Sequence, residues 1–319
     1  MAEWLYEAGI GEARAALIED GRIVKARIEL DDGAPRVGAI LRAQLLEPPK
    51  GRLVRVKLEG GEAMLEHAPR TLTQGASLIV EIVREAIPER GRPKLAKAVP
   101  APGAEATPGP DLLARITGSG LPVRHCLPHQ PDALEAAGGS ETLAEASDGE
   151  IAFEGGSLRL AVTPAMSLCD VDGAGALDRL AVDAADAAAR ASVRLGIGGS
   201  IGIDFPTLAN KAERIAVAEA IDAALPLPFD RTAVNGFGFL QIIRPRLRAS
   251  LPELLAADIA AAEARALLRR IEREPPAGAR SHRVSPRVHR ALEAHPHWRA
   301  DLARRTGTSH LFEIDGAQR

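Results

Sequence analysis

The sequence predicts a mixed α+β protein of several domains, and three observations favour this class. The chain has 319 residues, enough for two or three domains that each bury a core of their own. Short segments with period-two alternation of apolar and charged residues fill residues 38–98, as is typical of β-strands. Beyond residue 180, alanine-rich segments show helical periodicity. The chain therefore joins a strand-rich N-terminal part to a part in which strands and helices alternate.

The N-terminal part is predicted to form a hairpin followed by a small barrel. Residues 13–19 and 23–30 flank Asp20-Gly21, a dipeptide that suits the turn of a β-hairpin. Between residues 36 and 100, several short strands separated by Gly and Pro favour a small barrel such as an OB-fold. An unspecialised β-sandwich is the alternative.

Composition also marks where the later parts of the chain begin. Residues 99–110 are rich in Pro, Gly and Ala without periodic apolar content, which is typical of a linker. Residues 111–150 carry no motif with a clear function. Residues 252–273 predict one long helix that ends before two consecutive prolines, and residues 282–314 predict a small terminal α+β unit.

Composition restricts the possible partners and location. With 40 basic and 43 acidic residues the net charge is -3, so a nucleic acid would have to bind to a local basic surface. The two cysteines match neither a disulfide framework nor a zinc motif, and we expect a reducing cytoplasm. No apolar run approaches the roughly 20 residues of a membrane span, and the N-terminus lacks a secretion signal pattern. We therefore expect neither membrane insertion nor secretion.

Two aspartates come at the ends of predicted strands. Asp170 lies in the segment 165–171, Asp204 lies in the segment 199–205, and an alanine-rich helix separates the segments. Paired strands would bring the two carboxylates together, and Mg²⁺ takes one or two carboxylates plus water and substrate phosphate. We interpret the pair as a Mg²⁺ site for phosphodiester chemistry, with Asp172 as either a third ligand or an outer-shell acid. The alternative is that each aspartate caps a strand and faces solvent.

Two further features extend this hypothesis. Asp204 lies between apolar residues, so we expect its carboxylate to be buried with a compensating partner. The apolar strand predicted after Gly236 ends in Arg244 and Arg246, and guanidinium groups suit bidentate contact with phosphate. An exposed arginine pair on the tail of a strand is the alternative.

These segments resemble the catalytic domain of ribonuclease E/G. The resemblance is strong over roughly a third of the chain, in residues 154–173, 183–190, 198–205 (GGSIGIDF) and 237–251 (FGFLQIIRPRLRASL). It implies a deoxyribonuclease-I-like α/β domain in which Asp170 and Asp204 bind one Mg²⁺, with Mn²⁺ as a substitute. It also implies RNA as the partner and basic side chains as its phosphate contacts: Arg244, Arg246, Arg84, Arg92 and Lys94.

A weaker resemblance to the same family begins at residues 11–30 and continues through the barrel. The implied domains are the hairpin of a reduced RNase H-like subdomain (1–35), an OB-fold-like RNA-binding barrel (36–100), a linker with the remnant of the RNase H-like and sensor parts (101–150), the catalytic domain (151–252), and a helix with a small C-terminal domain (253–319).

The sequence departs from the family in four respects. Asp172 stands where the family has Asn, and residues 52–65 of the barrel lack the aromatic side chains that stack on a base. Residues 111–150 are too short for the sensor of the five-prime end, so no preference for monophosphate ends is predicted. No zinc-binding Cys-Pro-x-Cys motif follows Leu251. We expect no zinc and no zinc-bridged tetramer, while a metal-free homodimer stays open.

The sequence thus predicts a Mg²⁺-dependent endoribonuclease that hydrolyses single-stranded RNA. If the family chemistry holds, the products carry a five-prime phosphate and a three-prime hydroxyl. The main alternative, favoured by Asp172 and the missing aromatics, is a catalytically weak or inactive RNA-binding protein of the same fold. A third hypothesis is an unrelated α/β phosphatase or nuclease that acts on DNA.

Overall fold

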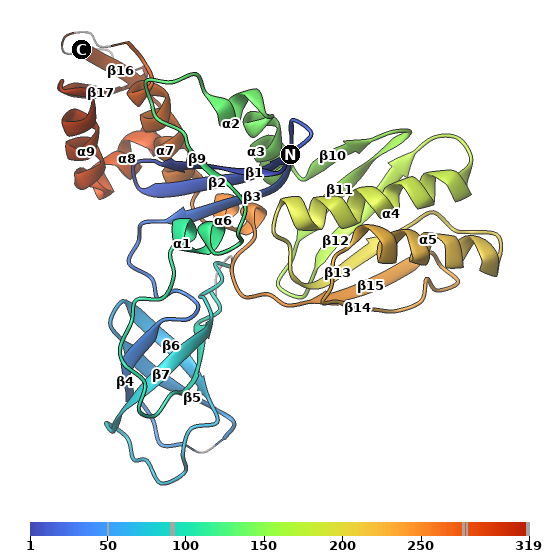
Figure 1. The fold of residues 1–319 in the computed structure, drawn as a ribbon, viewed down its shortest axis with the longest axis horizontal. Helices are drawn as coiled ribbons and strands as arrows, with labels where there is room; N and C mark the ends of the chain where they lie inside the picture. The colour runs from blue at the N-terminus through green and yellow to red at the C-terminus, as the bar shows by residue number, and fades with distance from the viewer. Residues whose placement is uncertain (50, 90–92, 276–277, 279, 317–319) are drawn as a thin grey trace.

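The structure is a computed structural model that describes residues 1–49, 51–89, 93–275, 278 and 280–316. Its elements form three lobes that meet near the centre of the molecule (Figure 1). One lobe is a barrel, the second is a six-stranded sheet with two helices, and the third combines a four-stranded sheet with the C-terminal helices. The mixed α+β class predicted from the sequence is confirmed.

Five strands of the N-terminal part close into a barrel. In barrel order they are β4 (Ile40–Leu45), β5 (Leu53–Leu58), β6 (Gly61–Glu66), β8 (Ala96–Pro100) and β7 (Ser77–Arg84). On β5 the side chains of Val54, Val56 and Leu58 are buried, and the charged residues between them are exposed. The predicted small barrel is confirmed, and the β-sandwich alternative is wrong because the sheet closes on itself.

The barrel is inserted into a four-stranded sheet. The order of this sheet is β3 (Arg22–Leu30), β2 (Glu12–Glu19), β1 (Glu3–Ala8) and β9 (Val123–His125). Positive φ angles at Asp20 (50°) and Gly21 (76°) form the predicted hairpin turn. The chain leaves the sheet after β3, builds the barrel, and returns to place β9 parallel to β1.

Residues 101–150 contain regular elements besides the linker. Three helices flank β9 in the chain: α1 (Leu112–Thr117), α2 (Ala133–Ala136) and α3 (Gly139–Asp148). Leu112 and Ile116 of α1 pack against Trp4 and Leu17 of the four-stranded sheet. This segment therefore completes the structure that the N-terminal hairpin begins.

The second lobe is a six-stranded sheet with helices on one face. In sheet order its strands are β10 (Glu150–Phe153), β11 (Gly156–Val162), β12 (Ser167–Gly173), β13 (Gly199–Asp204), β15 (Phe239–Arg244) and β14 (Asp230–Arg231). Helices α4 (Leu177–Arg194) and α5 (Lys211–Ala224) contribute buried alanine and aliphatic side chains to a shared core with Ile201, Ile203 and Leu240. Both helices lie over the same face of the sheet (Figure 1). The small alanine side chains of α4 let it lie close to the strands, so the core is on this face.

The described residues of the C-terminal part form four helices and a two-stranded parallel sheet. Its elements are α6 (Leu251–Ala257), α7 (Ile259–Glu272), β16 (Arg280–Val284), α8 (Pro286–Ala294), α9 (Pro296–Thr306) and β17 (His310–Ile314). The prediction of one helix over residues 252–273 is wrong. Asp258 leaves the helical conformation (φ −146°, ψ 87°), and its side chain accepts a hydrogen bond from the Ala261 amide, so a new helix begins there.

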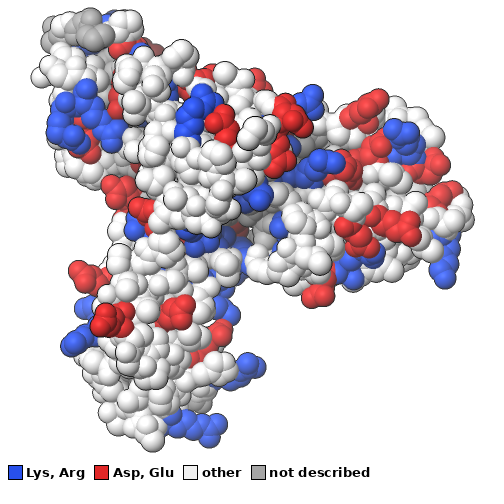
Figure 2. Space-filling model, viewed as in Figure 1, with Lys and Arg blue, Asp and Glu red and all other residues white. Residues whose placement is uncertain are grey.

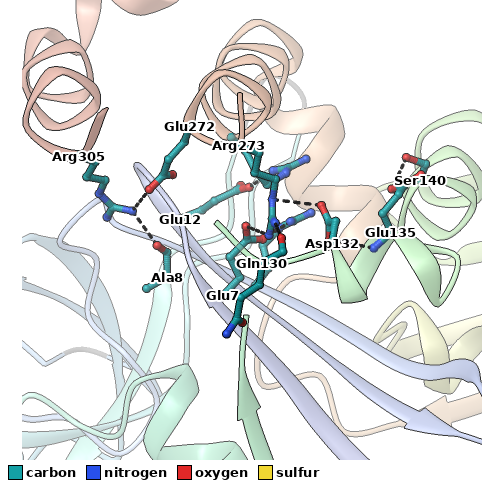
Figure 3. A network of polar contacts seen from close by, with 12 residues as sticks. Glu7, Ala8, Glu12, Gln130, Asp132, Glu135, Ser140, Glu272, Arg273 and Arg305 are labelled. Atoms are coloured by element: carbon teal, nitrogen blue, oxygen red, sulfur yellow. Dashed lines mark hydrogen bonds and ion pairs between the residues drawn. The ribbon is translucent and has the colours of Figure 1, made fainter. Parts of the chain in front are cut away.

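Buried ion pairs join helix α7 to the four-stranded sheet (Figure 3). Glu12 accepts hydrogen bonds from Arg265 Nε at 2.8 Å and from Arg269 Nη1 at 2.9 Å. Glu7 pairs with Arg273, the residue that follows α7, at 2.7 Å. Both glutamates are at least 93% buried, so these contacts hold the N-terminal and C-terminal segments together. No helix in the part of the chain that the structure describes is long and apolar enough to cross a membrane.

Candidate functional site

Asp170 and Asp204 lie side by side on neighbouring strands. The parallel pairing of β12 with β13 puts their Cα atoms in register, and neighbouring strands are about 4.8 Å apart. Side chains alternate along a strand, so the adjacent residues Cys169 and Ile203 are buried against the helices while both carboxylates are exposed on the opposite face. The structure thus brings together the two acids that the sequence singles out.

The expected burial of Asp204 is wrong. Its apolar neighbours Ile203 and Phe205 are buried on the helical side, but period-two alternation turns the Asp204 side chain to solvent. Neither Asp170 nor Asp204 has a hydrogen-bond or ion-pair partner among the described residues. Both carboxylates are therefore available to a cation from solution.

A row of side chains crosses four strands on this open face. The register joins Arg159 of β11 to Asp170, Asp170 to Asp204, and Asp204 to Phe239 of β15. Asp172 lies two residues beyond Asp170, and its Oδ2 is 3.8 Å from Arg159 Nη2. In the described part of the chain no three His, Cys, Asp or Glu side chains form a group that could hold a metal, so Asp172 does not join the pair in such a group.

The donor chemistry of the pair fits Mg²⁺. Mg²⁺ binds hard oxygen ligands, keeps several of its waters, and needs only one or two carboxylates from a protein. Asp170 and Asp204 supply two such carboxylates at an exposed position where waters and a phosphate have room to complete the coordination. Mn²⁺ shares the preference for oxygen ligands.

Arg244 and Arg246 lie far from this pair. Because β15 runs antiparallel to β13, Arg244 pairs with Gly199 at the opposite end of β13 from Asp204. Five steps along a strand separate the two ends, which corresponds to about 17 Å. Arg246 forms ion pairs with Glu253 and, at 3.6 Å, with Glu89. These two arginines therefore do not contact a phosphate that is bound directly at the acids.

Two of the three basic residues predicted on the barrel, Arg84 and Lys94, lie near the same end of the sheet as Arg244. Lys94 donates from Nζ to the Pro164 carbonyl at 3.2 Å, in the turn between β11 and β12, and pairs with Glu89 at 2.5 Å. Arg84 donates to the Leu95 carbonyl at 2.6 Å. Arg92 lies outside the described residues.

A basic cleft lies where the lobes meet. Its volume is about 720 Å³, and Figure 2 shows Lys and Arg side chains in the hollow between the lobes. Seven basic and three acidic residues line it: Lys25, Arg27, Arg36, Arg115, Arg244, Arg246 and Arg248, with Glu29, Asp32 and Glu85. Sequence reasoning missed Arg27, Arg115 and Arg248, since they come from separate segments and share no local motif.

Two arginines of this cleft lack a compensating carboxylate. Arg115 pairs with Glu29, and Arg248 with Glu85, whereas Arg27 and Arg244 have no carboxylate partner within the described ranges. Burial, followed by repulsion from nearby arginines including Arg244, lowers the pKa of Arg27 to about 10. Burial also lowers the pKa of Arg244. An anion bound in the cleft would offset the unfavourable burial of the positive charges of Arg27 and Arg244.

The sequence matches no protein-family model. A comparison with curated proteins gives no match either. The resemblance to ribonuclease E/G therefore stays an expectation, and the geometry around Asp170 and Asp204 is what supports a function.

Proposed function

We propose that this protein is a Mg²⁺-dependent endoribonuclease of the ribonuclease E/G type that hydrolyses single-stranded RNA. The observation that carries the proposal is the parallel register of Asp170 with Asp204 on the open face of the six-stranded sheet. Two exposed carboxylates side by side repel each other, and a divalent cation with its bound phosphate relieves that repulsion. In this proposal residues 151–252 are the deoxyribonuclease-I-like catalytic domain, and residues 36–100 are the RNA-binding barrel.

Asp170 and Asp204 would hold the ion. When bound there, Mg²⁺ supplies a Lewis acid that lowers the pKa of a coordinated water and offsets charge on the phosphate oxygens. The side chain of Arg159 lies one strand from Asp170 in the same row and is largely exposed, so its guanidinium can bind a phosphate oxygen beside the acids. Arg159 is absent from the sites predicted from the sequence, because nothing in its local pattern marks it.

The basic cleft supports a polyanionic substrate. Arg27 and Arg244 carry charges that no carboxylate balances within the described structure, and a phosphate of an RNA strand would balance them. The cleft and the acid pair lie at opposite ends of β13, and alternation along β15 puts Arg244 on the helical face of the sheet, like Leu240 and Ile242. An RNA strand that contacts both would therefore pass around the end of the sheet.

Cleavage of a fluorescent, unstructured A/U-rich RNA tests the proposal. We expect cutting with Mg²⁺, none with a chelator, and a loss of at least about a hundredfold for Asp170→Asn and Asp204→Asn, since each removes one charged ligand. Asp20→Asn is the matched control, because Asp20 is exposed in a hairpin turn whose positive φ an asparagine also adopts. It should cut like the wild type.

Each contrary result has a defined meaning. Retained RNA binding without cleavage by the wild type would assign the alternative function, a catalytically inactive RNA-binding protein. Equal cutting of DNA and RNA would show a nuclease without preference for RNA. Cleavage that survives in Asp170→Asn and Asp204→Asn would place the reaction elsewhere.

A further inference from the structure

Phe237 is an aromatic side chain that the fold leaves in water. It is 85% exposed, more than any other phenylalanine in the described structure. A single exposed apolar side chain is common on protein surfaces and carries no meaning by itself. Here two further observations point to a function for the exposed ring: a hydrogen-bonded turn fixes its position, and the acid pair lies beside it.

A well-bonded turn holds Phe237 in place. Asn235 Oδ1 accepts hydrogen bonds from the amides of Phe237 at 2.9 Å and Phe239 at 3.0 Å. Gly238 adopts φ 92°, and a Cβ there would lie 2.3 Å from the Phe205 carbonyl oxygen. The Phe205 amide donates to the Gly238 carbonyl at 3.1 Å. The turn is thus fixed to the strand that carries Asp204.

This turn lies directly beside the acid pair. Phe239, the first residue of β15, pairs with Asp204, and Phe237 precedes it by two residues, a span of at most about 7 Å. Phe239 and Met166 also cover the backbone of Gly202, where a Cβ would come within 2.7 Å of the Phe239 ring and 3.0 Å of the Met166 sulfur. The face next to the carboxylates therefore has an apolar floor.

We propose that Phe237 stacks on an unpaired nucleobase of the RNA strand whose phosphate is bound at Asp170 and Asp204. This inference rests on the proposed function and names the part of the substrate that the site recognises. A nucleotide joins an anionic phosphate to a flat apolar base, and the site offers carboxylates for a metal-bound phosphate beside an exposed ring and an apolar floor.

The chemistry of stacking defines which ligands fit. Every base has a π-face, so one phenylalanine accepts any base, but it needs a base that is not already stacked in a duplex. The ligand class is therefore single-stranded RNA with little sequence preference at this position. Residues 52–65 of the barrel contain no aromatic side chain. In this proposal, Phe237 of the six-stranded sheet lobe therefore provides the stacking contact near the reacting phosphate.

Tryptophan fluorescence tests the contact. Phe237→Trp is made in the otherwise native chain, and the RNA probe is a short analogue whose backbone resists hydrolysis, so that both proposed ligands of the ion stay in place. The two native indoles, Trp4 and Trp298, are 6% and 4% exposed and give a constant background. With Mg²⁺ present, we expect a short single-stranded A/U-rich RNA to quench the introduced indole, and the same sequence as a duplex to leave its emission unchanged.

Affinity variants separate stacking from simple apolar contact. With the same probe we expect Phe237→Ala and Phe237→Leu to weaken RNA binding about 5- to 150-fold, and Phe237→Tyr to bind like the parent. Ile215→Ala is the control, because Ile215 is exposed on α5, which covers the other face of the sheet. It should bind RNA like the parent.

The outcomes distinguish the two proposals. If the wild type cleaves RNA and Asp204→Asn abolishes cleavage, yet Phe237→Ala leaves affinity unchanged, the stacking contact is wrong and the nuclease stands. If the wild type does not cleave but RNA quenches the indole at position 237, the stacking contact stands on a protein without nuclease activity. Absence of any RNA binding overturns both.

Discussion

Asp172 adds a third negative charge to the open face of the six-stranded sheet. It lies two residues from Asp170, about 7 Å along the strand, and the exposed Arg159 at 3.8 Å balances it only in part. The resemblance to ribonuclease E/G implies a neutral asparagine at this position. A carboxylate here should strengthen the attraction for Mg²⁺ through water without being a ligand itself.

We therefore predict that Asp172→Asn raises the Mg²⁺ concentration for half-maximal cleavage about two- to fivefold. The effect is small because solvent and salt screen exposed charges at this separation. The measurement is a Mg²⁺ titration of cleavage at constant ionic strength, with Asp20→Asn beside it. An unchanged Mg²⁺ requirement would mean that the ion does not sense Asp172, whereas complete loss of cleavage would make Asp172 a ligand.

At the scale of elements, helix α7 depends on the glutamates of the four-stranded sheet. We predict that Glu12→Gln lowers the free energy of unfolding by about 3–5 kcal/mol, because Arg265 and Arg269 then lose their buried counter-charge. Denaturant unfolding followed by circular dichroism measures this. Glu263→Gln is the control, since that ion pair with Arg287 lies on the exposed side of α7, and its loss should cost less than about 1 kcal/mol. Equal losses in the two variants would contradict a special role for Glu12.

Helices and strands could be predicted from the sequence where neighbouring residues determine the backbone conformation. Asp20-Gly21 fixes a hairpin turn, and the alternation through Val54, Val56 and Leu58 fixes a strand of the barrel. Asp258 was missed because alanine-rich composition continues on both sides of it, and a single capping aspartate hardly changes the helical pattern. The parallel neighbour of β1 was also unpredictable, since β9 is only three residues long and lies 115 or more residues away.

The candidate site likewise combines features that the sequence predicts with features that it does not. One helix separates the strands that carry Asp170 and Asp204, and a strand, helix, strand unit places its two strands in parallel, so the sequence order predicts that they can meet. Only Asp204 ends its strand, because β12 continues past Asp170 to Gly173. The reverse direction of β15 carries Arg244 to the other end of the sheet, and composition alone does not show that direction. The sequence does not mark Phe237 as a site residue, because its exposure depends on the turn at Gly238.

At the scale of the whole molecule, the three lobes jointly form the basic cleft. We predict that Arg244→Gln weakens RNA binding and makes log affinity fall less steeply with log salt, by about 0.7 for one lost contact to single-stranded RNA. Fluorescence anisotropy at several salt concentrations measures the slope. Arg304→Gln removes the same charge from an exposed position on α9 and should keep the wild-type slope. A lower affinity with an unchanged slope would show that Arg244 acts through folding.

The pKa of Arg27 gives the cleft a defined pH dependence. Burial lowers it to about 10, so the charged form is disfavoured in the folded protein. This destabilisation of the folded protein is fully present below about pH 10 and is lost progressively as the pH rises above that value. At neutral pH a short RNA in the cleft should therefore raise the melting temperature, and Arg244→Gln should reduce that rise. Thermal unfolding with and without RNA measures it.

The buried pairs between β2 and α7 also govern the order in which the protein acquires its structure during synthesis. The barrel is continuous in the chain, so we expect it to fold as soon as it leaves the ribosome. Arg265, the partner of Glu12, is made 253 residues later. Until Arg265 is available, burying Glu12 in the sheet would leave its carboxylate without a counter-charge. The N-terminal lobe therefore becomes stable only after α7 has been made, so we expect the cleft to assemble later in translation than the barrel.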